Sequence, residues 1–414
     1  MIESIGEEAF NFQDERFADI QMLRYRLPDF ESLTIPQKQL IYCLSEATLF
    51  GRDITFDQFG KYNLRIRKTL EAVYLNFNGD RLEHNFRALE EYLKHVWFAS
   101  GIYHHYACDK FSPLFTEDFF RNEVLAIDSK LLPLNDGESV TSLLNELCPV
   151  IFDPTILPKR VDKSDGKDIV RSSACNYYDG VSQHEVEEFY TKLKKDGPIN
   201  EAPSYGLNST LVKEGDSICE DVWKIGGKYN AAIEKIVYWL NRAKDFVEND
   251  QQLHVINLLI RYYETGDLHD FDIYSIEWLR EQEGRIDFIN GFIEVYGDPM
   301  GLKGSWEGIV EYKDLEATHR TQAISANAQW FEDHSPVDPQ FRKAIVKGVT
   351  ANVICAAMLG GDEYPASAIG INLPNADWIR AEHGSKSVTI SNLTHAYDMA
   401  AKGNGFREEF VIDA

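Results

Sequence analysis

Two glutamates beside a predicted hairpin turn are the first residues of this chain whose types and spacing suggest chemistry. Residues 286–296 alternate with a period of two, which predicts a strand with Phe288, Asn290, Phe292, Glu294 and Tyr296 on one face. Residues 297–301 have the composition of a turn, and residues 306–310 then read as the returning strand. In a hairpin centred near residues 300 and 301, Glu294 faces Glu307 and Tyr296 lies nearby.

A pair of facing glutamates suggests a cation between them, because like charges directly opposite each other destabilise two paired strands. The terminal ammonium group of a substrate, a metal ion, or a lysine or arginine of the chain itself would serve as that cation. Alternatively, the register is slipped and both glutamates face water. The spacing alone leaves these possibilities open.

Two asparagines form a second candidate binding element. The short apolar segment Ile369-Gly-Ile ends in Asn372-Leu-Pro-Asn375. Each carboxamide offers a donor and an acceptor, which suits binding to the backbone of an extended peptide. The same residues are also common in ordinary Asn-Pro turns, and the pattern does not decide between the two.

Recognisable catalytic motifs are absent from the sequence. No His-x-x-x-His pair occurs, and the one His-Glu dipeptide, His184-Glu185, fits a helix capping box that begins at Ser182. There is no phosphate-binding glycine loop and no nucleophile elbow. We therefore assign no metal ligand, and the residues alone indicate binding groups without a complete catalytic apparatus.

The composition excludes several classes of protein. The 414 residues hold 42 Lys and Arg against 67 Asp and Glu, a formal net charge of −25, which repels phosphate backbones and argues against a nucleic-acid partner. The longest apolar run, residues 353–359, is too short to span a membrane. We expect a cytoplasmic protein if Met1 is the native start, although a signal peptide could have been removed.

The elements that must position these groups follow from local patterns. The first 150 residues predict mostly helix, including one helix capped by Thr34, and residues 150–220 are rich in turn residues. Long helices are predicted for residues 221–249 and 251–265. Residues 315–334 are also predicted to be helical.

The segments GFIEVYGDPMGLKGSWE (residues 291–307) and IGINLPN (residues 369–375) resemble the signatures of the dipeptidyl peptidase III family of zinc metallopeptidases. Asn176-Tyr177-Tyr178 matches the family more loosely. Gly51-Arg-Asp and residues 325–331 are similar to its bacterial, Bacteroides-like branch. The likeness extends over essentially the whole chain.

The resemblance implies an α+β fold, in which a mainly helical lobe wraps around a small β-barrel. Residues 1–314 and 351–398 would form this substrate-binding lobe. Residues 315–350 and 399–414 would be partial segments of a second, helical lobe that carries zinc.

The resemblance also implies a function, the zinc-dependent release of dipeptides from the N-termini of short peptides. Glu294 and Glu307 would hold the substrate's ammonium group, and Asn372 and Asn375 would hold its backbone. Tyr296 would be the catalytic residue that donates a hydrogen bond to the oxyanion.

Two departures from the family pattern limit what this chain is expected to do. Gly297 stands where many relatives have arginine, and the family's zinc-binding His-Glu helix has no counterpart in the sequence. We therefore expect the substrate-binding portion of the enzyme, which ends before the zinc motifs, binds no catalytic zinc and is inactive alone. The alternative is a non-catalytic peptide-binding or scaffolding module.

Overall fold

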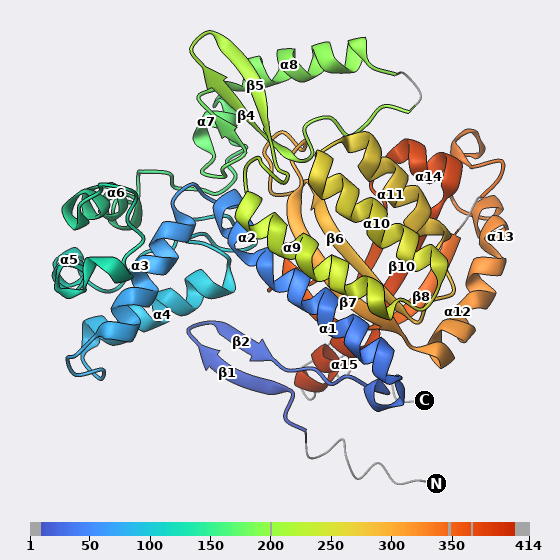
Figure 1. The fold of residues 1–414 in the computed structure, drawn as a ribbon, viewed down its shortest axis with the longest axis horizontal. Helices are drawn as coiled ribbons and strands as arrows, with labels where there is room; N and C mark the ends of the chain where they lie inside the picture. The colour runs from blue at the N-terminus through green and yellow to red at the C-terminus, as the bar shows by residue number, and fades with distance from the viewer. Residues whose placement is uncertain (1–9, 199–200, 347–348, 366, 402–414) are drawn as a thin grey trace.

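The computed structural model describes residues 10–198, 201–346, 349–365 and 367–401. Figure 1 shows a group of helices on the left, a five-stranded sheet with its covering helices on the right, and a smaller sheet at the top. The expected mixture of helices and strands is confirmed. In these ranges no helix is long and apolar enough to cross a membrane.

The first part of the chain is helical, as predicted, except for one short hairpin formed by β1 (Gln13–Phe17) and β2 (Ile20–Leu23). Thr34 caps the following helix α1 (Ile35–Phe50) with the expected capping box. Five further helices enclose an apolar core of their own. They are α2 (Arg52–Gln58), α3 (Asn63–Asn76), α4 (His84–Phe98), α5 (Glu117–Ala126) and α6 (Val140–Phe152).

The main sheet carries the candidate site. Its spatial order is β6-β7-β8-β10-β9, in which β8 and β10 are parallel and the other pairs are antiparallel. The described strands form an open sheet with β6 and β9 at its edges, so the expected closed β-barrel is not found among them. The strands are β6 (Ile286–Glu294), β7 (Ser305–Lys313), β8 (Val349–Gly361), β9 (Gly370–Leu373) and β10 (Ser385–Ile390).

Helices cover this sheet and share the largest apolar core with it. They are α1 (Ile35–Phe50), α9 (Asn230–Ala243), α10 (Asp250–Thr265), α11 (Leu268–Arg280) and α14 (Asp377–His383). The helix predicted from residue 221 begins nine residues later than expected. Strand β5 occupies residues 217–222, and the turn at Gly226-Gly227 separates it from α9.

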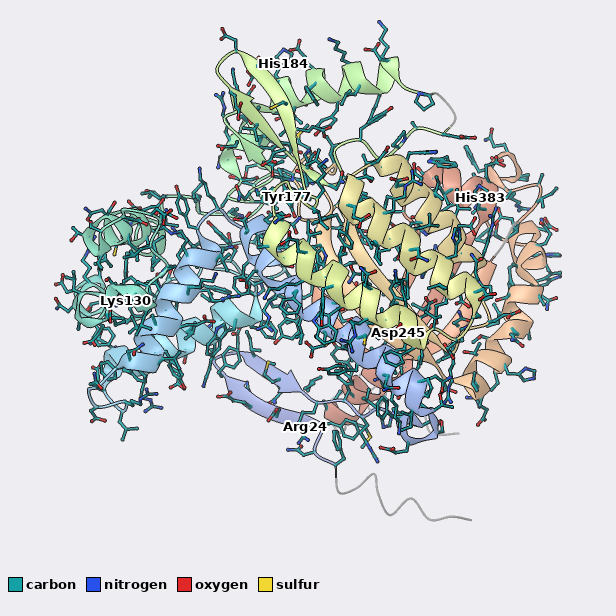
Figure 2. The ribbon with its side chains drawn as sticks, in the orientation of Figure 1. Arg24, Lys130, Tyr177, His184, Asp245 and His383 are labelled. Carbon is teal, nitrogen blue, oxygen red and sulfur yellow. The ribbon has the colours of Figure 1, made fainter. Side chains whose placement is uncertain are left out.

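The smaller sheet consists of β3 (Tyr178–Asp179), β4 (Ser209–Glu214) and β5 (Ser217–Val222), and it lies beside α7 (Ile169–Ser172) and α8 (Gln183–Asp196). Ser182 and Glu185 form the predicted capping box of α8. Tyr177 connects the smaller sheet with the main sheet (Figure 2): its carbonyl accepts a hydrogen bond from the N–H of Leu211, and its hydroxyl lies 2.9 Å from Ser305 Oγ.

The chain leaves the main sheet after β7 and forms α12 (Leu315–Ala326) and α13 (Ala328–Asp333) before it returns in β8. Thr318 Oγ1 donates a hydrogen bond to Val353 O at 3.0 Å, so α12 lies along β8. The proposed division into two lobes stays a prediction, and residues 402–414 of its second part lie outside the described ranges. The remaining helices are α15 (Ser391–Ala400) and the 3-10 turns η1 (Phe30–Ser32), η2 (Ser129–Leu131), η3 (Lys244–Phe246) and η4 (Pro339–Phe341).

Candidate functional site

The hairpin β6–β7 forms where it was predicted, but its register differs from the expected one. Glu307 lies opposite Gly291, whereas Glu294 lies opposite Ser305, because a bulge follows Phe292. The predicted direct pairing of Glu294 with Glu307 is therefore wrong. The two carboxyl groups are nevertheless close enough for the charge of Glu294 to raise the pKa of Glu307.

The loop between β6 and β7 is held by buried side chains. The carboxylate of Asp298, which is fully buried, accepts hydrogen bonds from the backbone N–H groups of Met300, Leu302 and Lys303. Gln58 of α2 donates to Gly304 O at 3.0 Å and accepts from the N–H of Trp306 at 2.8 Å. These contacts fix the two strand ends that carry the candidate residues.

Gly297, the first departure from the family pattern, has a steric explanation. A Cβ atom at this position would lie 2.9 Å from Ser305 Oγ and 3.2 Å from the hydroxyl of Tyr177. The Tyr177–Ser305 hydrogen bond thus occupies the space that a side chain would need. An arginine here would require this part of the hairpin to rearrange.

Four of the five predicted site residues line one cleft with a volume of about 730 Å³. We call it the acidic cleft, after its carboxyl groups Glu294, Asp362 and Glu363; its other polar lining residues include Tyr296, Asn372, Asn375, His105, Arg160 and Arg380. Strand β6, the loop after β8 and the loop after β9 each contribute to it. The structure therefore brings together groups that lie far apart in the sequence.

Two asparagine contacts order the cleft. Asn375 donates from Nδ2 to Glu294 Oε1 at 3.2 Å, and Ser387 donates from Oγ to Asn372 Oδ1 at 3.1 Å. Both asparagines are exposed, and so is Tyr296, whose exposed fraction is 83%. These side chains are available to a ligand.

Glu307, the fifth predicted residue, is buried and does not line the cleft. Its exposed fraction is 1%, and Oε2 has no hydrogen-bond partner among the described residues. Burial raises its pKa well above the usual range, and the charges of Glu363, Glu294 and Asp362 raise it further. A buried carboxyl group therefore lies close to three carboxyl groups that line the cleft.

Asp362 and Glu363 were not identified from the sequence. They follow Gly360-Gly361 at the end of β8, so two acidic residues directly after a glycine pair at a strand end were the available signal. Burial raises the pKa of Asp362 to about 7, and the Arg160 guanidinium opposes this shift. Arg160 also lines the cleft and stacks on Phe59, with its guanidinium carbon 4.3 Å from the ring centroid.

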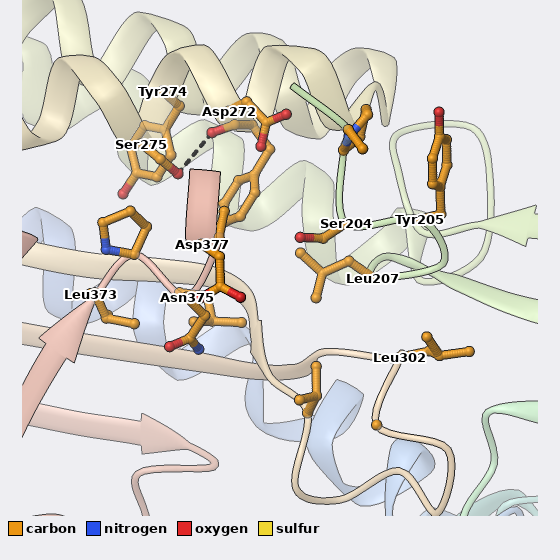
Figure 3. Close-up of a pocket in the computed structure, with 18 of the residues that line it drawn as sticks. Ser204, Tyr205, Leu207, Asp272, Tyr274, Ser275, Leu302, Leu373, Asn375 and Asp377 are labelled. Carbon is orange, nitrogen blue, oxygen red and sulfur yellow. Dashed lines mark hydrogen bonds between the residues drawn. The ribbon is translucent and has the colours of Figure 1, made fainter. Parts of the chain in front are cut away.

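A second cavity, of about 670 Å³, lies on the other side of Asn375, between α11 and the loop after β9 (Figure 3). Its walls are mainly apolar and include Tyr274 and Leu373. Burial raises the pKa of Asp272, which lines this cavity, to about 7, and the charge of Asp267 adds to the effect. Asn375 is the only predicted site residue that lines it, so the acidic cleft is the candidate site.

The cleft does not resemble a zinc centre in its donor groups. In the part of the chain that the structure describes, no three His, Cys, Asp or Glu side chains are arranged to share a metal ion. His184-Glu185 belongs to the capping box of α8, where His184 lies 3.5 Å from Glu188. The residues present therefore do not fit the zinc site that the family implies.

Comparison with known proteins agrees with the fold. The model of Peptidase family M49 matches residues 181–410, more than half of the chain. This match covers enough of the chain to show its family: the chain belongs to Peptidase family M49.

The relatives with curated descriptions include dipeptidyl peptidase 3 of Nematostella vectensis, which is 23% identical over 355 residues, 79% of this chain and 48% of that protein. Dipeptidyl peptidase 3 of Homo sapiens is 28% identical over 184 residues, 44% of this chain and 25% of that protein. The chain thus spans less than half the length of these relatives.

Solved structures share the fold. DPP III from Caldithrix abyssi superposes with a TM-score of 0.63 at 16% identity, over 90% of this chain and 58% of that one. Dipeptidyl-peptidase III from Corallococcus sp. strain EGB gives a TM-score of 0.65 at 17% identity, over 93% of this chain and 60% of that one.

Proposed function

We propose that this chain is the substrate-binding portion of a zinc-dependent dipeptidyl peptidase and binds short peptides through their free N-termini. The single observation that supports this most strongly is the convergence of Glu294, Asn372, Asn375 and Tyr296 in one cleft. Each of these residues matches the family motif at its own position.

The edge of the main sheet suits an extended peptide. Strand β9 pairs with β10 on one side and forms an edge of the described sheet on the other. An extended peptide adds to such an edge through backbone hydrogen bonds. In the proposed complex, Asn372 and Asn375 bind the peptide backbone and the carboxylates receive its ammonium group.

Tyr296 has a separate role in this proposal. Its hydroxyl donates a hydrogen bond to the oxygen of the peptide bond that is cleaved, where negative charge develops in the transition state. Zinc, when bound elsewhere in the complete enzyme, would supply the activated water. We propose that the 414 residues alone do not hydrolyse peptides, since the family's zinc motif is missing from them.

The binding proposal is tested by calorimetric titration of the purified chain with a tetrapeptide that has uncharged side chains. We expect micromolar binding of the peptide with a free amino terminus and at least tenfold weaker binding of its N-acetylated form. Equal affinity for the two peptides would contradict the proposal, because acetylation removes the charge that the acidic cleft is proposed to bind.

The catalytic part of the proposal has its own test. A dipeptidyl-arylamide incubated with the purified chain should release no amine, with or without added zinc. Release that a chelator abolishes would show that these residues form a complete zinc peptidase.

The proposed lobe boundary is tested by limited proteolysis. The protease should cleave the chain within residues 315–350 earlier than it cleaves the strands of the main sheet.

A further inference from the structure

The loop after β8 places two carboxyl groups beside the glutamates of the hairpin. Gly361 pairs with Glu307 across the β7–β8 ladder, and the N–H of Asp362 donates to Trp306 O at 3.0 Å. The backbone therefore holds Asp362 and Glu363 next to Glu307, and Glu294 lines the same cleft as Asp362 and Glu363.

Glu363 is oriented by its own loop. Its Oε2 accepts hydrogen bonds from Ser367 Oγ at 2.9 Å and from the N–H of Ala368 at 3.3 Å. The described hydrogen bonds of this side chain all go to Oε2, so Oε1 is left for another donor. Burial raises the pKa of Glu363, the two hydrogen bonds oppose that shift, and the charge of Glu294 adds to it.

Glu363 lines the cleft and Glu307 does not. Glu307 is 1% exposed and its unpartnered Oε2 has no access to solvent, whereas Glu363 is half-buried and lines the cleft wall. A ligand in the cleft can therefore contact Glu294 and Glu363 directly. It cannot contact the buried Glu307.

The negative charges of four neighbouring carboxyl groups repel one another, and this repulsion must be offset by positive charge or by protonation. Arg160 stabilises the charged form of Asp362, and the charges of Glu294 and Glu363 act on the buried Glu307. A bound cation between Glu294 and Glu363 would relieve this repulsion. An ammonium group carries three hydrogen-bond donors, and the carboxylates of Glu294 and Glu363, which line the same cleft, are acceptors for them.

We propose that Glu363, together with Glu294, directly binds the terminal ammonium group of the peptide, and that the buried Glu307 makes no direct contact with it. The proposal rests on the proposed function, since it names a further specificity-determining residue of the same site. It assigns to Glu363 a contact that the family resemblance assigns to Glu307.

The test compares Glu363→Gln and Glu294→Gln with the wild-type chain in titrations with the uncharged tetrapeptide and its acetylated form. Charge-assisted hydrogen bonds are stronger than neutral ones, so E363Q should weaken binding of the free-amine peptide by about tenfold or more. Binding of the acetylated peptide should stay unchanged. Glu214→Gln, an exposed change of the same charge on the hairpin β4–β5, is the matched control.

Each outcome separates the two proposals. If E294Q weakens binding of the free-amine peptide and E363Q does not, the proposed function stands and the role of Glu363 is refuted. If wild type does not distinguish the two peptides, the proposed function itself fails. Equal weakening of both peptides by E363Q would show a structural role and overturn the assignment.

Two controls complete the test. The unfolding temperature of E363Q should not fall, because the change removes a negative charge from a repulsive cluster. A rise in the unfolding temperature of wild type with calcium chloride that is lost in E363Q would identify a metal-ion site and overturn the ammonium assignment.

Discussion

The side-chain nitrogen of Asn375 lies 3.2 Å from Glu294 Oε1 and donates a hydrogen bond to it, although 81 positions separate the two residues. This bond connects the end of β6 with the loop after β9, so the two proposed binding elements form one unit. It opposes the rise in the pKa of Glu294 that burial causes. Asn375 therefore helps to keep this carboxylate charged and oriented.

Replacing Asn375 with alanine should weaken the binding of a free-amine peptide by about fivefold to tenfold, since a hydrogen bond to a charged group is lost. The pKa of Glu294 should rise further. Titration calorimetry measures the first effect, and the acid limb of affinity against pH measures the second. Unchanged affinity together with an unchanged acid limb would refute the role of this contact.

Peptide affinity should rise with pH on the acid side and fall again on the alkaline side. Burial raises the pKa values of Glu294 and Glu363, and only their ionised forms attract an ammonium group. Above about pH 8 the peptide amine, whose usual pKa is about 7.7–8.0, loses its own proton. Calorimetry from pH 5 to pH 9 checks this profile.

The matched comparison for this profile is the variant E363Q. The affinity of E363Q at low pH should change differently from that of wild type, because one of the two titrating carboxyl groups has been removed. The fall in affinity at high pH is caused by the peptide amine and should be the same in both. A flat profile for wild type would contradict recognition of the ammonium group by carboxylates.

The stability of the chain should also depend on Asp362. Burial raises the pKa of its carboxyl from 3.8 to about 7, so between these values the folded chain keeps a proton that the unfolded chain has lost. Stability then falls as pH rises through this window. We expect Asp362→Asn to gain stability relative to wild type by at least about 1.4 kcal/mol between pH 4 and pH 8.

Urea unfolding at several pH values measures this difference. Asp136→Asn, an exposed change of the same type on the loop before α6, is the control. A constant difference between D362N and wild type at all pH values would show that Asp362 does not hold the extra proton.

Local patterns predicted much of this site, and long-range geometry explains what they missed. Alternation predicted β6, and the residues after the turn predicted the returning strand β7. Strand-end chemistry made Asn372 and Asn375 candidates for peptide binding or for an ordinary turn, and only the family resemblance favoured binding. The predicted register was wrong because a bulge after Phe292 shifts the pairing of the two strands. A single extra residue of this kind cannot be recognised from the alternation of residue types.

Two acidic residues of the cleft were missed for the same reason. Asp362 and Glu363 join the site because Gly361 pairs with Glu307, a contact between strands far apart in the sequence. The early start of the predicted helix at residue 221 had a local cause, because Gly226-Gly227 was not treated as a break. The wrong boundary still lay outside the cleft, so it did not affect the choice of site residues.

Tyr296 should separate binding from catalysis. Its side chain is exposed in the cleft, and the proposed hydrogen bond forms with charge that exists only in the transition state. Tyr296→Phe in the 414-residue chain should therefore bind the tetrapeptide within about twofold of wild type. In a form of the enzyme that hydrolyses peptides, kcat should fall by about 10²–10³ while KM changes little. Loss of peptide affinity in Y296F without a loss of kcat would instead make Tyr296 a binding residue.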